Sequence, residues 1–165
     1  MRWLWLALVL SACTRTTADA GLAVIDAGDD CTLATVLTPG IAGSPEHLIA
    51  SERNPNGDSE LAALMRMMQS DLEAARGTLL AGGTLPALHP GHRKIRCAWP
   101  TVTDDRNASF DANAAAYLLR VKSLDAATTE ASRKAAYESV ISGCLACHAV
   151  TCPGPIAAIT PLRLP

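Results

Sequence analysis

The chain has 165 residues, enough for one domain and too few for two of ordinary size. Its 14 basic and 16 acidic residues give a formal net charge of −2, which leaves no positive excess to neutralise phosphates and argues against nucleic-acid binding. Hydrophobic residues make up 49% of the chain, mostly Ala and Leu, and only 4% of residues are aromatic. This composition predicts an all-α fold rather than a sheet.

The N-terminus has the features of an export signal. Met1 and Arg2 precede an apolar run over residues 3–10, which is too short to span a bilayer. The next residues, Leu10-Ser11-Ala12-Cys13, resemble the lipobox of bacterial lipoproteins, in which the cysteine is diacylated and becomes the first residue of the mature chain. Residues 1–12 are then the signal peptide. An ordinary signal peptide cut at small residues is the alternative, and it would change the anchoring but not the compartment.

The residue after Cys13 bears on the membrane to which the protein is anchored. In bacterial lipoproteins an Asp at that position favours retention in the inner membrane, whereas this chain has Thr14. The resemblance therefore implies attachment through lipidated Cys13 on the periplasmic side of the outer membrane.

Residues 13–43 are rich in Ala, Gly, Asp and Thr without a sustained period, which predicts an irregular tether. The folded domain is expected over residues 44–165. At its start, Ser44 suits a helix cap and Pro45 suits the first helical position. We therefore expect a short helix from Ser44 to about Arg53.

Three long helices are expected in the rest of the chain, and each follows from apolar residues spaced by three and four positions. The first covers residues 59–81, with Asp58 as the candidate cap. Proline at positions 86, 90 and 100 limits residues 82–106 to short or broken helices, so His89 and His92 are expected to be exposed loop residues. His47, on the short helix before them, is likewise not expected to be a ligand. The second helix covers residues 108–126, and the third follows Thr128-Thr129. Such helices are most simply packed as an antiparallel helical bundle with a site between facing helices.

The third helix carries Cys144-Leu145-Ala146-Cys147-His148 on its apolar face. Cys-x-x-Cys-His is typical of covalent haem attachment, because one helical turn presents two sulfurs to the vinyl groups and the adjoining His reaches the iron. A zinc site built from Cys144, Cys147, His148 and Cys152 is an alternative that would give a zinc-stabilised interaction domain. A thiol-disulfide centre is a further alternative, but such motifs usually open a helix, whereas this one closes a helix.

From residue 59 to residue 165 the chain resembles the class II c-type cytochromes, the cytochrome c-prime-like family, which carry Cys-x-x-Cys-His near the end of the last helix of a four-helix bundle. The resemblance runs through Leu64-Met65-Arg66-Met67-Met68, the helix from Phe110 to Leu124, and the haem motif. Thr151-Cys152-Pro153-Gly154-Pro155 and the 17 residues after His148 depart from that family and look like a variant group of small haem proteins.

The resemblance implies one covalent haem c held by Cys144 and Cys147, with His148 as an axial ligand. It also implies single-electron transfer between periplasmic redox partner proteins and dimers formed through the helices. No catalytic acid, base or nucleophile stands out beside the motif, so we expect an electron carrier and not an enzyme.

The opposite axial position decides between two functions. By the resemblance Met65 is the first choice for the sixth ligand and Met68 the second, whereas Met67 points elsewhere on the helix. A thioether ligand suits electron transfer, whereas an open position suits binding of small gases such as nitric oxide or carbon monoxide. The alternative role for both methionines is to fill the core.

Three cysteines remain, Cys31, Cys97 and Cys152, which is an odd number for an oxidising compartment. Cys97 and Cys152 both lie beside prolines in irregular segments, and we expect these two to form a disulfide. Haem propionates need cationic or polar partners, for which the candidates are Arg66, Lys94, Arg106 and Arg120.

Overall fold

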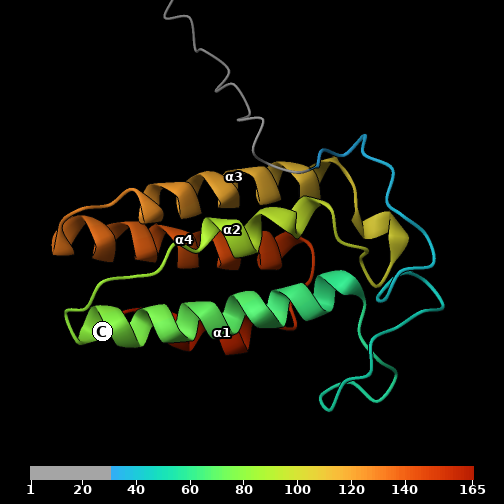
Figure 1. Ribbon diagram of the computed structural model, residues 1–165, viewed down its shortest axis with the longest axis horizontal. Helices are drawn as coiled ribbons and strands as arrows, with labels where there is room; N and C mark the ends of the chain where they lie inside the picture. The colour runs from blue at the N-terminus through green and yellow to red at the C-terminus, as the bar shows by residue number, and fades with distance from the viewer. Residues whose placement is uncertain (1–30) are drawn as a thin grey trace, which may run out of the picture.

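The computed structural model describes residues 31–165, so the predicted signal peptide and Cys13 lie outside the described residues. This part of the chain is helical without any strand, apart from one isolated antiparallel bridge between Ile49 and Asp58. Figure 1 shows the three long helices, α1 (Glu60–Leu80), α3 (Ala108–Asp125) and α4 (Glu130–Val150). The shorter elements are α2 (His89–His92), α5 (Ile156–Ile159) and 3-10 turns at Arg93–Arg96, Thr103–Asp105 and Thr160–Leu162. The all-α prediction is confirmed.

Helix α1 lies within one residue of the predicted limits, and its caps explain why. The side chain of Ser59 accepts a hydrogen bond from the Ala62 amide at 3.1 Å, which satisfies one of the free amides of the first turn. Ser59 is therefore the cap in place of Asp58, whose carboxylate instead pairs with Arg66. At the other end Gly82 takes a φ of 69°, a left-handed conformation that ends the helix.

Helices α3 and α4 form an antiparallel hairpin joined by residues 126–129. Asn107 caps α3 by accepting hydrogen bonds from the amides of Ser109 and Phe110. Thr129 caps α4 and exchanges hydrogen bonds with Ser132, as the Thr128-Thr129 position predicts. A connection this short keeps two helices adjacent and antiparallel. In Figure 1, α1 runs in the same direction as α3 and opposite to α4.

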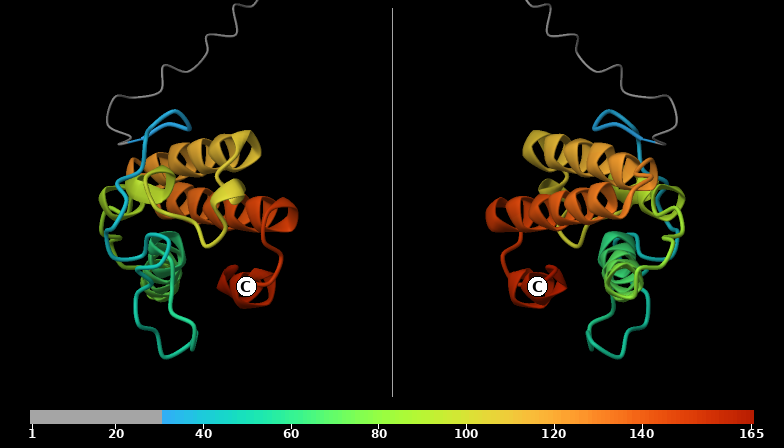
Figure 2. Two further views of the ribbon diagram at one scale, coloured as in Figure 1. Left: turned by 90° about the vertical axis from the view of Figure 1, so that its right-hand side faces the viewer. Right: turned by 90° about the vertical axis from the view of Figure 1, so that its left-hand side faces the viewer.

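Residues 31–165 form three long helices with irregular segments before α1, between α1 and α3 and after α4, and a four-helix bundle is not shown. Residues 81–107 lead back along the bundle from the end of α1 to the start of α3, and their prolines permit only short helices. The end-on views of Figure 2 place the C-terminal turns beside α1 and α4, at the corner across from α3. Within the described residues no helix has the length and apolarity needed to cross a bilayer.

One tyrosine joins three parts of the core. Tyr137 of α4 is fully buried, and its hydroxyl lies 3.1 Å from the Leu72 carbonyl oxygen and 2.8 Å from that of Leu162. The hydroxyl donates to carbonyls of α1 and of the C-terminal segment, so the burial of this polar group is compensated. Burial raises the pKa of Tyr137 well above its usual value, and it stays a neutral donor.

The helix predicted from Ser44 to Arg53 is wrong, because these residues form turns. The Ser44 hydroxyl donates back to the Ile41 carbonyl at 2.7 Å and so closes the preceding turn instead of capping a following helix. Gly43, with a φ of 88°, lies against the start of α1, where a Cβ would collide with the backbone of Glu60. The Glu60 amide also donates to the Gly43 carbonyl, which fixes the turn to that helix.

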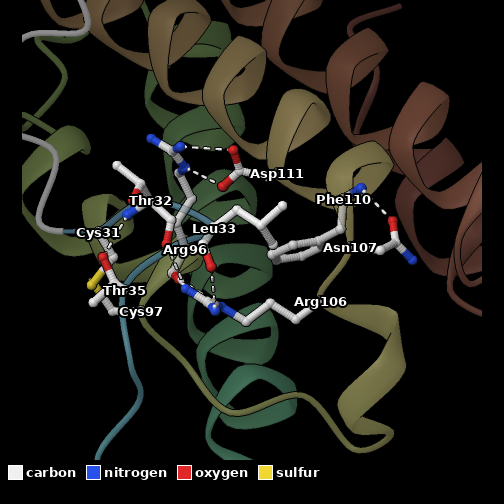
Figure 3. A network of polar contacts seen from close by, with 10 residues as sticks. All are labelled: Cys31, Thr32, Leu33, Thr35, Arg96, Cys97, Arg106, Asn107, Phe110 and Asp111. Carbon is white, nitrogen blue, oxygen red and sulfur yellow. Dashed lines mark hydrogen bonds and ion pairs between the residues drawn. A yellow bond between two sulfur atoms is a disulfide. The ribbon is translucent and has the colours of Figure 1, made fainter.

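The predicted pairing of Cys97 with Cys152 is also wrong, since Cys97 is bonded to Cys31 and Cys152 is free and exposed. Figure 3 shows why residues near Cys31 lie beside Cys97. The guanidinium of Arg106 donates to the carbonyls of Thr32, Leu33 and Arg96, which brings the two segments together. Residues 31–43, expected as part of a tether, are thereby fixed to the helical domain.

A buried ion pair supports the same corner. Arg96 is only 2% exposed and makes two parallel hydrogen bonds of 2.8 Å to the carboxylate of Asp111 on α3. Two parallel hydrogen bonds to a carboxylate replace hydrogen bonds to water that the guanidinium loses on burial. The segment 93–97 is therefore held on α3 at the same place where the disulfide enters (Figure 3).

Candidate functional site

A cavity of about 370 Å³ lies between the three long helices and the C-terminal segment. This volume falls within the roughly 300–1,000 Å³ that is usual for ligand pockets. Each long helix contributes to the wall, and most of the contributed side chains are apolar or weakly polar. The principal lining residues are Met65, Met68 and Leu72 of α1, Phe110, Ala114 and Tyr117 of α3, and Gly143, Cys144, Cys147 and His148 of α4.

The three functional side chains of the haem motif meet at this cavity. They lie in the last two turns of α4, with Cys147 three residues after Cys144 and His148 four residues after it. Residues three and four apart share a face of an α-helix. All three line the cavity and are partly buried, as the apolar stripe predicts for Cys144 and His148.

The imidazole of His148 is oriented by the backbone that follows α4. Its Nδ1 lies 2.8 Å from the carbonyl oxygen of Cys152. A carbonyl oxygen only accepts hydrogen bonds, so Nδ1 carries the proton and the lone pair is on Nε2. Metal-bound histidines are oriented in the same way by a partner of their second nitrogen. The turn at Thr151-Cys152-Pro153 thus prepares His148 to bind a metal through Nε2.

The two motif cysteines are protonated thiols in this chain. Burial, followed by the neighbouring Cys147, raises the pKa of the Cys144 thiol to about 12. Burial also raises the pKa of Cys147, against a hydrogen bond with Thr151 that lowers it. Thiol-disulfide enzymes need the opposite, a thiol of lowered pKa. The environment of this Cys-x-x-Cys therefore gives the thiol-disulfide alternative no support.

The methionines of α1 face the cavity from the opposite wall. Met65 and Met68 both line it, whereas Met67 is 41% exposed and does not. Met68 is 4% exposed and belongs to the packed core, but Met65 is only partly buried at the core's edge. Of the two candidate ligands, Met65 has the fewer packing contacts to lose if its sulfur binds a metal.

Cationic side chains reach the cavity at one end. Of the four candidates for propionate partners, only Arg66 is in the wall, and Arg53 joins it from the preceding turn. Arg106 is engaged with the N-terminal segment, and Arg120 of α3 donates to the Ser139 carbonyl on α4. Sequence periodicity did not identify Arg53 because it lies in an irregular turn.

His92, expected to be an exposed loop residue, is instead completely buried. Its Nδ1 lies 2.7 Å from the Tyr117 hydroxyl and its Nε2 lies 3.2 Å from the Asp71 carboxylate. The ring also stacks on Tyr117, with centroids 5.9 Å apart and an interplanar angle of 20°. The prediction failed because the 82–106 segment folds onto α1 and α3 instead of extending into solvent.

The side chains proposed for a zinc site do not assemble into one. Within residues 31–165, no group of three or more His, Cys, Asp or Glu side chains is gathered so that it could hold a metal ion. The zinc alternative therefore has no ligand set in the described part of the chain.

Comparison of the chain with models of known protein families, with characterised proteins and with solved structures gives no match.

Proposed function

We propose that this protein is a c-type cytochrome with one covalent haem c in the cavity between α1, α3 and α4, and that it transfers single electrons. The observation that carries the proposal is that Cys144, Cys147 and His148 of α4 line one apolar cavity, which Met65 of α1 lines as well. A bound haem would supply the reversible one-electron couple of its iron.

The residues of the chain have separate tasks in this proposal. Cys144 and Cys147 would hold the group through two thioether bonds, and both enter that chemistry as protonated thiols. His148 would bind the iron through Nε2, because the Cys152 carbonyl holds its Nδ1. The apolar lining would set the polarity around the group, which is one influence on its reduction potential. Arg53 and Arg66 line the cavity and would supply positive charge to carboxylates of the group, although Arg66 already pairs with Asp58.

Export and anchoring belong to the same proposal. Haem attachment to Cys-x-x-Cys-His and the Cys31–Cys97 disulfide both suit an oxidising compartment outside the cytosol. We infer that the protein is held on the periplasmic side of a bacterial membrane through lipidated Cys13, which lies outside the described residues. Redox partner proteins would approach it there. Fatty-acid labelling of the wild-type chain that disappears in Cys13→Ser supports the anchor, whereas unchanged labelling contradicts it.

Haem attachment is tested in cells that carry haem-attachment machinery. The wild-type chain should retain haem on a denaturing gel, whereas the double variant Cys144→Ser, Cys147→Ser should lose it. Cys152→Ser is the matched control, since Cys152 also lines the cavity but lies outside the motif. Absence of covalent haem from the wild-type chain under these conditions would contradict the proposal.

The sixth ligand is tested by absorption spectroscopy. With Met65 bound, the ferric protein should show the long-wavelength charge-transfer band of thioether ligation, and the ferrous protein should resist carbon monoxide. Met65→Ala should remove the band and admit carbon monoxide, whereas Met67→Ala, on the exposed face, should change neither. Rapid carbon monoxide binding by the wild-type protein would instead favour the gas-binding function.

A further inference from the structure

Behind the cavity wall lies a chain of three hydrogen-bonded side chains from three different elements. Asp71 on α1 contacts His92 of α2, and His92 contacts Tyr117 on α3. The side chain of Asp71 is 41% exposed, His92 is fully buried, and Tyr117 forms part of the cavity wall. The three residues therefore form a hydrogen-bonded connection between solvent and the wall of the proposed haem site.

The partners fix the protonation of His92. An ionised carboxylate only accepts hydrogen bonds, so the Asp71 contact requires a proton on Nε2. In the neutral ring Nδ1 is then an acceptor, and the Tyr117 hydroxyl donates to it. If Nδ1 gains a proton, both ring nitrogens donate, and the Tyr117 hydroxyl must turn and accept. The two protonation states of His92 thus correspond to two hydroxyl orientations at the cavity wall.

Burial and the neighbouring charges act on the pKa of His92 in opposite directions. Burial is the largest influence and lowers its pKa below the usual 6.5. The carboxylates of Asp71 and of Asp125, at the end of α3, act in the opposite direction, and His89 on α2 adds to the lowering. Burial also raises the pKa of Tyr117, so the phenol keeps its proton. The proton on Nδ1 of His92 therefore depends on the charges around the ring.

We propose that His92 is a redox-linked proton acceptor of this protein, which binds one proton when the proposed haem is reduced and releases it on oxidation. This inference rests on the proposed function, because reduction is the event that changes the charge in the cavity. A bound haem would take one electron from a donor protein, and Nδ1 of His92 would then bind one proton from solvent. The loss of a positive charge in the cavity would favour the imidazolium, since charges interact more strongly in the interior than in water.

The midpoint potential of the haem-loaded protein, measured between about pH 4 and pH 8, tests this assignment. In the wild type the potential should fall as pH rises across the titration of His92. The limit is a tenfold change in the reduction equilibrium per pH unit, or about 59 mV for one electron. His92→Gln should abolish this pH dependence of the potential. Asp71→Asn should move the pH range in which the potential changes to lower pH, because the imidazolium loses its counter-charge.

Glu73→Gln is the matched control. Glu73 lies two residues from Asp71 on α1, is exposed, and accepts a hydrogen bond from Gln69. Glu73→Gln removes one negative charge from α1, as Asp71→Asn does, but removes no contact with His92. The pH range over which the potential changes should therefore stay the same. An equal slope in His92→Gln and the wild type would overturn the assignment.

A second measurement does not depend on a buried substitution. Histidine-labelled wild-type protein, titrated by nuclear magnetic resonance in both oxidation states, should give a higher pKa for His92 in the ferrous state. Equal pKa values in the two states would overturn the inference. Covalent haem with a pH-independent potential contradicts only the role of His92, whereas a wild-type chain without covalent haem contradicts the proposed function as well.

Discussion

The two halves of α4 differ in how completely the protein itself fills the space beside them. In the first part, which we take up to Ile141, Tyr137, Val140 and Ile141 are fully buried, and the Tyr137 hydroxyl has partners on α1 and in the C-terminal segment. In the second half Cys144, Cys147 and His148 are only partly buried and border a cavity. The same helix therefore stabilises the fold with one half and leaves an apolar space open with the other.

The buried residues of the first part of α4 serve packing, whereas the cavity residues of the second part are available for chemistry. Protein interiors are normally filled to the density of organic crystals, so an apolar cavity of about 370 Å³ beside a well-packed helix is a place for a ligand. A covalent group there would complete the core of the second half. Three substitutions in α4, one of His92 at the cavity side and a labelling experiment on the cysteines compare the two.

The largest effect is expected from shortening a buried side chain in the packed part of α4. Ile141→Ala removes a fully buried side chain and should lower the free energy of unfolding by about 2–5 kcal/mol. Leu145→Ala, one turn later and only partly buried, should cost less because water already reaches that side chain. Urea unfolding of the two variants measures the difference, and equal losses would contradict the comparison.

A smaller effect is expected from removing the hydroxyl that joins the packed half to its neighbours. Tyr137→Phe keeps the ring but leaves the carbonyls of Leu72 and Leu162 without their donor. The expected cost is about 1–3 kcal/mol, the usual penalty for buried groups that lose their partner. The measurement is thermal or urea unfolding beside the wild type. A neutral result would mean that water replaces the hydroxyl.

The pH dependence of stability should come partly from the cavity side, through His92. Because burial lowers its pKa in the folded chain, the unfolded chain binds the proton more readily. The stability from the neutral ring is present above pH 6.5, the unfolded value, and is lost as pH falls through the lower folded value. In the haem-free chain, the free energy of unfolding, measured in urea, should fall less between about pH 7 and pH 5 for His92→Gln than for the wild type. A wild type equally stable at both pH values would contradict this.

The smallest effect is kinetic and compares two cysteines of the cavity half. In the haem-free chain, Cys144 should react slowly with an alkylating reagent at neutral pH, because burial raises its pKa to about 12 and little thiolate forms. Cys152 is exposed and should react first. Mass mapping over time distinguishes the two. Faster labelling of Cys144 would contradict the protonated state described here.

The sequence predicted the long helices because each carries its own signals. Apolar spacing and capping residues such as Thr129 are local, and they place α1, α3 and α4 almost to the residue. The same periodicity places Cys144, Cys147 and His148 on one face, and Met65 on the facing helix. The Cys-x-x-Cys-His motif and the family resemblance, together with helical spacing, therefore identified most of the candidate site.

The features that were missed depend on contacts between distant segments. Cys31 pairs with Cys97 across a sequence separation of 66, and no local pattern records that approach. His92 lies among prolines and glycines, yet α1 and α3 bury it. The Cys152 carbonyl that orients His148 is a backbone group, which residue identity does not reveal. Tertiary packing decided each of these.

The disulfide also has a mechanical consequence. Cys31 and Cys97 close a ring of chain that contains all of α1, including Met65. If the chain ahead of Cys31 is pulled against the C-terminus, the load passes through the sulfur–sulfur bond to Cys97 and then into α3 and α4. Helix α1 lies outside that path. A force applied to the N-terminal side would therefore be carried by the Cys31–Cys97 disulfide and would not stretch the segment that contains Met65.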